Sequence, residues 1–155
     1  MGKLLFRIAR LKILGTFVGL VFAYFPFLIP IKKISKNADA VAFFHPAPSY
    51  PNHILIIPRK IARTVFHLSA DDFIAIVKMA EKIRGSNNTL LINGGIRQDV
   101  MQAHFHLFLG NKDFELKREK KNFWEAFDIS ELKAKEAFSI LIRFEEDSSH
   151  SVYIV

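Results

Sequence analysis

From Gln102 to Leu107 polar and apolar side chains alternate, and this limits the folds open to the chain. The segment reads Gln-Ala-His-Phe-His-Leu. Successive side chains of a β-strand point to opposite faces, so the pattern predicts a strand over 104–109 with Gln102, His104 and His106 on one face. The alternate residues would then pack into a core. The chain therefore requires a sheet with one apolar face and one face that carries imidazoles.

Other segments predict further strands around one helix. Apolar and β-branched runs bounded by turn residues predict strands at 31–35, 40–44, 53–58 and 89–93, and a hairpin at 138–144 and 151–155. Ser69, followed by Asp71 and Asp72, predicts the start of a helix that continues to Arg84. A short helix is expected near Ser130–Lys135. The expected fold class is α+β, with one central helix.

The N-terminal segment is apolar without interruption by charge. No charged residue occurs from Ile13 to Ile31, and Lys3, Arg7 and Arg10 precede this run. Its length is close to the roughly 20 residues that cross a bilayer, although two prolines interrupt helix near its end. We expect residues 1–28 to form a hydrophobic and basic helix. It either associates with a membrane or packs against protein, so a cytoplasmic and a membrane-associated location both stay open.

Composition narrows the classes of protein and of site that remain possible. The chain has 155 residues, half of them hydrophobic, which fits one packed domain with an extension. It has no cysteine, which excludes disulfides and thiolate metal sites. A net charge of +7 suits nucleic acid, a membrane surface or a phosphorylated small substrate equally well.

The histidine pair suggests phosphate chemistry. On a strand, His104 and His106 would lie about 7 Å apart on one face. A neutral imidazole is a competent nucleophile and proton carrier near pH 7. Asn93, Gln98 and the amides of the Gly94–Gly95 pair could donate hydrogen bonds to phosphate oxygens. A metal site formed by His53, His104 and His106 is the alternative interpretation.

Residues 29–110 resemble the histidine-triad (HIT) superfamily. The segment NHILIIPRK is similar to that family's G-H-x-L-V-I-P-K strand, and LSADDFIAIVKMAEKI to its central helix. The segment LLINGGIRQDVMQAHFHLF is similar to its N-x-G…G-Q-x-V-x-H-x-H-x-H signature. The resemblance implies a HIT-like antiparallel sheet with a central helix over residues 29–112. A hydrophobic helix (1–28) would precede this domain and an extension (113–155) would follow it.

By resemblance, the chain is a nucleotide hydrolase or nucleotidyl transferase. His104 would attack the α-phosphorus and form a nucleotidyl-histidine intermediate, His106 would assist the leaving group, and His53 would support the nucleophile. The implied substrate-binding residues are Asn93, Gln98, Gln102 and Phe43, the last as a wall for the base. We expect a small nucleotide as substrate, a homodimer, no cofactor, no metal and no specific nucleic acid. His45 and His67 are expected in loops or at strand ends, outside the site.

The chain departs from the family pattern at three positions. Gln102 stands where the first triad histidine would be, Ile61 replaces a frequent histidine, and Asp99 replaces a frequent Ser or Thr. A glutamine cannot carry a proton near neutrality, so an altered rate or substrate is expected. Two alternatives stay open. One is the membrane-associated branch that cleaves CDP-diacylglycerol, which the glutamine and the hydrophobic N-terminus suggest. The other is a nucleotide-binding module without catalysis.

Overall fold

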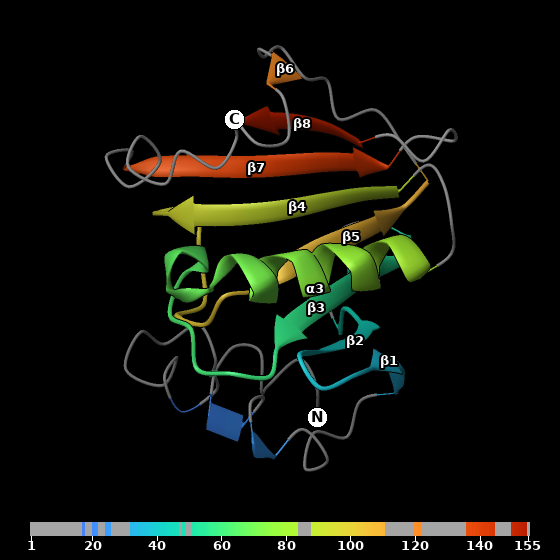
Figure 1. Cartoon of the computed structure of the whole chain (residues 1–155), viewed down its shortest axis with the longest axis vertical. Coiled ribbons are helices and arrows are strands. Elements are labelled where there is room, and N and C mark those ends of the chain that lie inside the picture. The colour runs from blue at the N-terminus through green and yellow to red at the C-terminus, as the bar shows by residue number, and fades with distance from the viewer. Residues whose placement is uncertain are drawn as a thin grey trace.

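An antiparallel sheet with a helix on one face forms the centre of the molecule (Figure 1). The computed structural model describes residues 17, 20–21, 24–25, 32–46, 48, 51–83, 88–110, 120–121, 136–144 and 150–154. Within these ranges eight strands pair in the order β1-β2-β3-β5-β4-β7-β8-β6. The strands are β1 (Lys33–Lys36), β2 (Ala40–Phe44), β3 (His53–Pro58), β4 (Asn88–Gly95), β5 (Phe105–Leu109), β6 (Lys120–Lys121), β7 (Ala137–Phe144) and β8 (His150–Ile154). Helix α3 (Ala70–Lys82) lies across the sheet, after the short 3-10 helix η2 (Val65–His67).

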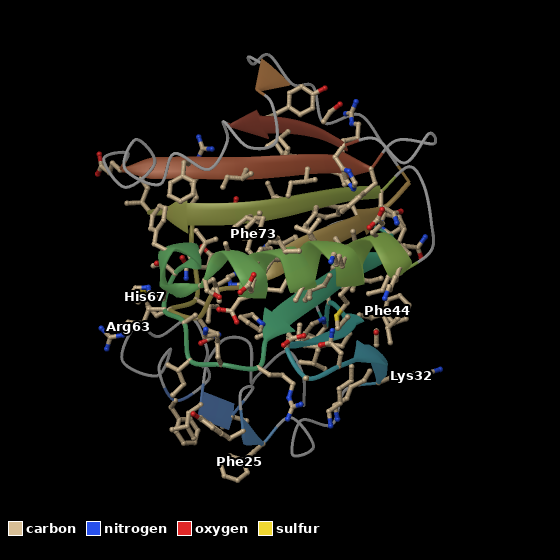
Figure 2. The ribbon with its side chains drawn as sticks, viewed as in Figure 1. Phe25, Lys32, Phe44, Arg63, His67 and Phe73 are labelled. Atoms are coloured by element: carbon tan, nitrogen blue, oxygen red, sulfur yellow. The ribbon has the colours of Figure 1, made fainter. Side chains whose placement is uncertain are left out.

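The core lies between α3 and the sheet. Phe105 and Leu107 of β5 are fully buried, and Phe105 meets Phe73 of α3 edge-on with ring centroids 5.7 Å apart (Figure 2 labels Phe73). The helix contributes residues that recur at helical spacing, such as Ile76 and Ala80. Phe105 and Leu107 therefore face this core, as the sequence predicts.

The start of α3 explains why the helix begins where it does. Ser69 Oγ accepts a hydrogen bond from the Asp72 amide at 3.2 Å, and Asp72 Oδ2 accepts one from the Ser69 amide at 2.8 Å. This reciprocal capping satisfies amides that have no partner inside the helix. Lys60 also pairs with Asp72, which ties the residues that follow β3 to the helix start. The predicted cap at Ser69 is confirmed.

The C-terminal hairpin continues the same sheet. β7 pairs with β4 along its whole length, from Asn88 opposite Phe144 to Gly95 opposite Ala137, and β8 pairs with β7. The predicted hairpin is confirmed, and its place beside β4 was not predicted. β4 is longer than the strand predicted at 89–93, because it extends two residues further, to Gly95. The helix expected near Ser130–Lys135 lies outside the described residues.

Only part of the N-terminal segment is described. Phe17, Leu20, Val21 and Tyr24 are helical, and the Phe25 amide donates to the Val21 carbonyl at 2.9 Å. The rest of the helix predicted over 1–28 lies outside the described residues. Among the helices that the structure describes, none has the length and apolar character needed to cross a bilayer.

Candidate active site

The sheet face opposite α3 carries a row of directly opposed residues. His106 of β5 lies between Leu55 of β3 and Leu91 of β4, and Leu55 in turn lies opposite Phe43 of β2. Directly opposed residues of an antiparallel sheet point to the same face, so these four side chains share one side. His106 is therefore set in an apolar row, away from the helix, as the alternation predicts.

His53 and His106 are joined by a hydrogen bond. His53 Nε2 and His106 Nδ1 are 2.8 Å apart, and His53 Nδ1 is buried with no hydrogen-bond partner among the described residues. A buried N–H without an acceptor costs more than an unused lone pair. The single proton between the rings therefore belongs to His53 Nε2, which donates to His106 Nδ1. His106 then keeps its proton on Nε2, where it can donate to a ligand.

His104 is oriented by the backbone just before it. Its Nδ1 lies 2.8 Å from the Gln102 carbonyl oxygen, so Nδ1 must carry the proton and donate it. The remaining nitrogen, Nε2, keeps its lone pair. Its ring is half-buried and meets His106 edge-on, with centroids 4.9 Å apart. Burial lowers the pKa of His104, while its hydrogen bond to Gln102 and the charge of Asp99 act in the opposite direction. The imidazole is accordingly neutral near pH 7.

A fourth imidazole belongs to this cluster. His45, just after β2, stacks on His53 with ring centroids 4.3 Å apart and lies 6.2 Å from His106 by the same measure. Its amide donates to the His53 carbonyl at 2.8 Å, which closes the β2–β3 hairpin. His45 lies at a strand end, as expected, and hairpin pairing also brings its ring onto His53. His67 does not belong to this cluster. Figure 2 shows His67 on the opposite side of the view from Phe44, the residue that directly precedes His45 in the chain.

His53 and His106 are uncharged in the folded protein near pH 7. Burial, then the neighbouring imidazoles, lower the pKa of His53 to about 4 and that of His106 to about 2. A cation placed beside other imidazoles would lose hydration and be repelled. Both rings therefore stay neutral well below their ordinary pKa of 6.5.

We expect stability to fall as pH decreases from 6.5 to 5. The unfolded chain protonates these histidines near 6.5, whereas the native state leaves His53 neutral until about pH 4. The unfolded state thus binds more protons in this window, and its free energy falls by about 1 kcal/mol per pH unit for each such histidine. Urea unfolding midpoints at pH 7, 6 and 5 measure the effect. A His53→Asn variant should show a smaller slope, and an equal slope in both proteins would contradict the assignment.

Gln102 acts on the backbone around it. Its side chain is buried, donates to the Lys60 carbonyl at 3.0 Å and accepts from the Ala62 amide at 3.3 Å. β5 begins only at Phe105, so strand alternation does not extend back to this residue. The structure thus gives Gln102 two contacts: its side chain fastens the segment after β3, and its carbonyl orients His104.

Asn93 and Gln98 lie on neighbouring parts of the chain. Asn93 is opposite Ser139 of β7, and Ser139 Oγ donates to Asn93 Oδ1 at 2.8 Å. Arg97 Nη1 in turn donates to Ser139 Oγ at 3.1 Å. Gln98 donates to the Val100 carbonyl at 2.7 Å and also to the Arg63 carbonyl. Its amide therefore holds two loops together. Arg97 and Ser139 were not predicted, because only the β4–β7 pairing brings them to Asn93.

Phe43 and the glycine pair complete the predicted residues. The Phe43 ring is buried, whereas Phe44, on the other side of the strand, is 45% exposed. Gly94 lies within β4 opposite Phe138, and a Cβ there would overlap the Phe138 ring. Close packing explains this glycine. Gly95 has a positive φ of 59°, which favours glycine where the chain leaves the strand.

Comparison with known proteins identifies the family. The HIT domain family matches residues 27–113, more than half of the chain, and the protein belongs to this family. Among solved structures, a HIT family hydrolase from Legionella pneumophila Philadelphia 1 is 26% identical with a TM-score of 0.52, over 63% of this chain and 96% of that one. One from Clostridium thermocellum is 25% identical with a TM-score of 0.52, over 64% of this chain and 92% of that one. The expected family and fold are confirmed.

One curated relative adds a specific similarity. An adenosine 5'-monophosphoramidase of Schizosaccharomyces pombe, hnt1, is 35% identical over 85 residues. The match covers 51% of this chain and 64% of that protein, so the chain spans slightly less than two thirds of the relative's length.

Proposed function

We propose that the protein hydrolyses or transfers a small nucleotide at its α-phosphate through a covalent nucleotidyl-His104 intermediate. The observation that carries this proposal is the hydrogen bond from His104 Nδ1 to the Gln102 carbonyl. It fixes the tautomer in which Nε2 has a free lone pair, and burial keeps the ring neutral. A neutral imidazole with a fixed orientation is an activated nucleophile that needs no separate base.

The reaction would proceed in two displacements. A bound phosphate anion beside His106 favours its protonated form. As substrate binds, His53 would pass its Nε2 proton to His106 Nδ1 and take up a proton at its own Nδ1, so that His106 carries two N–H groups. Nε2 of His104 then attacks phosphorus, the bond to the leaving atom breaks, and that atom takes a proton from His106. Water next attacks the nucleotidyl-His104 phosphorus, His106 accepts the water's proton, and the bond to His104 breaks. The nucleoside monophosphate leaves, and His104 is regenerated.

The leaving group is proposed to be an amine on a nucleoside monophosphoramidate. The similarity to a monophosphoramidase supports this class. His53 would hold His106 through the 2.8 Å hydrogen bond, so that its Nε2 faces the leaving atom. Phe43, in the same cross-strand row as His106, is proposed as part of the wall beside the base. Gln98 and Gln102 would support the site through the backbone segments that they fasten.

Asn93 is proposed to bind the ribose or phosphate through its amide nitrogen. Because Ser139 donates to Asn93 Oδ1, the Nδ2 group is the end that can donate to substrate. We expect Ser139→Ala to raise KM about 3- to 10-fold with little change in kcat, since the lost hydrogen bond orients the ligand rather than the nucleophile. Steady-state kinetics test this expectation. A decrease in kcat with unchanged KM would contradict it.

A homodimer is proposed from the family resemblance, with α3 and its neighbouring strand at the interface. Sedimentation velocity of the full chain at micromolar concentration tests this assembly. A single species of 17.8 kDa would refute the dimer without affecting the chemistry at His104.

A second candidate is a lipid-linked nucleotide such as CDP-diacylglycerol. The observation that favours it is the exposure of helical apolar residues: Phe17 and Tyr24 are each 63% exposed and Leu20 is 37% exposed. Residues spaced three and four apart share one face of a helix, and such an apolar face can enter a membrane surface. Turnover of CDP-diacylglycerol in vesicles, with none of soluble phosphoramidates, would favour this substrate.

Intact-mass spectrometry tests the central proposal. The full chain is mixed briefly with adenosine or guanosine phosphoramidate, with dinucleoside polyphosphates, or with CDP-diacylglycerol, and then quenched. We expect a mass gain of one nucleoside monophosphate that is absent from His104→Ala and present in His150→Ala. His150 is a matched control because it contacts Glu81 of α3 and Phe144, on the helix side of the sheet. Nucleotide binding without adduct or product would instead support a binding module.

A further inference from the structure

The imidazoles around His106 form a group with the composition of a metal site. His45, His53 and His106 each offer one ring nitrogen, and these three nitrogens all lie within 4.8 Å of one another. They come from separate segments: the end of β2, the start of β3 and the middle of β5. The three-nitrogen alternative expected from the sequence used His104 instead. In the structure His104 Nδ1 is engaged by the Gln102 carbonyl, and His45 occupies the third position.

The chemistry of this group suits zinc. Zn²⁺ is bound by neutral imidazole nitrogens at about 2.0–2.1 Å in a tetrahedral arrangement, which places ligand nitrogens roughly 3.3 Å apart. The His53 Nε2 and His106 Nδ1 atoms are already 2.8 Å apart. With the metal between them, the His53 proton would move to Nδ1, so that both ligand rings stay neutral. His45 lies at the end of its strand, so its ring can turn from its stack on His53 without breaking the sheet.

Polar surroundings also support a cation here. His53 Nδ1 is buried without a hydrogen-bond partner among the described residues, so one polar atom of this group is left unpaired. Three protein ligands leave a fourth position for water or for a phosphate oxygen, as in zinc sites that remain open.

We propose that His45, His53 and His106 bind Zn²⁺, and that the bound ion stops turnover because it occupies the ring nitrogens that pair His53 with His106. Metal binding requires only these three imidazoles and is independent of the proposed reaction. The inhibitory consequence rests on the proposed function, since it requires His106 to serve as proton donor. His104 is outside the ligand set, so the ion and the nucleophile are separate features of one site.

Metal binding is tested directly, without any activity measurement. Zn²⁺ is titrated into the full chain in competition with a chromophoric chelator, and Co²⁺ is used to record visible d–d absorption. We expect one equivalent bound, with affinity decreased by about 100-fold in His45→Gln and unchanged in His104→Ala and in His150→Ala. His45→Ala, with folding checked by circular dichroism, provides a second variant. Unchanged affinity in both His45 variants, or loss of binding in His104→Ala, would overturn the assignment.

Inhibition is then measured separately. With a substrate that the wild type turns over, Zn²⁺ should inhibit reversibly, chelator should restore the rate, and His45→Gln should need about 100-fold more Zn²⁺ for the same inhibition. Equal sensitivity of wild type and His45→Gln would overturn the inhibitory role. If no substrate is turned over, the proposed function fails, while the titration still decides whether the metal site exists.

Discussion

Replacing His104 by glycine is expected to decrease turnover of a nucleoside phosphoramidate by about 10³-fold or more, because it removes the attacking atom itself. Imidazole added to the solution should restore part of the lost rate. It would enter the space vacated by the side chain, take the nucleotidyl group and release free nucleotidyl-imidazole. His104 lies in the chain segment between Gln102 and β5, and its ring is half-buried, so the truncation leaves the core of Phe105 and Leu107 intact. Product analysis by chromatography identifies the nucleotidyl-imidazole.

The matched control is His150→Gly, which should retain wild-type turnover and show no response to imidazole. Imidazole rescue limited to His104→Gly would separate nucleophilic catalysis from a general structural effect. Wild-type rates in His104→Gly would exclude His104 as nucleophile, and the neighbouring imidazoles would then have to carry the reaction.

Gly94→Val is expected to destabilise the protein by about 3 kcal/mol, a large core effect for a single added side chain. Gly94 is buried in β4 directly opposite Phe138, and a Cβ would overlap that ring. The Phe138 ring is itself buried and packs against Phe66, with centroids 5.3 Å apart, so it has little room to move. Urea denaturation should show a lower midpoint, and the thermal midpoint should fall by roughly 10 °C.

A double-mutant cycle assigns the cause of this loss. Phe138→Ala removes the ring and leaves a cavity, so it is destabilising alone. Combined with Gly94→Val, it should cost less than the sum of the single changes, with a coupling of about 1–3 kcal/mol. Additive losses would show that valine disturbs β4 for another reason, and the overlap with Phe138 would not be the cause.

Local patterns predicted most of the elements because they depend on neighbouring residues only. The strands at 40–44 and 53–58 have the predicted bounds, since each is a short apolar run closed by turn or proline residues. The start of α3 at Ser69 followed from a cap that involves residues three apart. Where prediction was less accurate, at the ends of β1, β4 and β5, strand length depends on the partner strand rather than on the segment itself.

The sequence predicts the part of the site that lies on the strand of His104 and His106 and in the HIT signature. The sequence alone determined that His104 and His106 come together, that Phe105 between them faces a core, and that the chain belongs to the HIT family. It did not predict that His45 lies against His53, or that Ser139 and Arg97 lie beside Asn93. Their positions depend on strand pairing between residues far apart in the chain, in the β2–β3 hairpin and in β4 beside β7.

The tertiary structure alone decided the protonation states and the contacts that follow from them. Local sequence cannot specify that His53 donates to His106, that the Gln102 carbonyl receives the His104 proton, or that Gln102 fastens the segment after β3. These properties depend on burial and on which polar atoms lie within hydrogen-bond distance after the strands pair. A linear pattern fixes side-chain spacing along one strand, whereas proton positions depend on neighbours contributed by several strands.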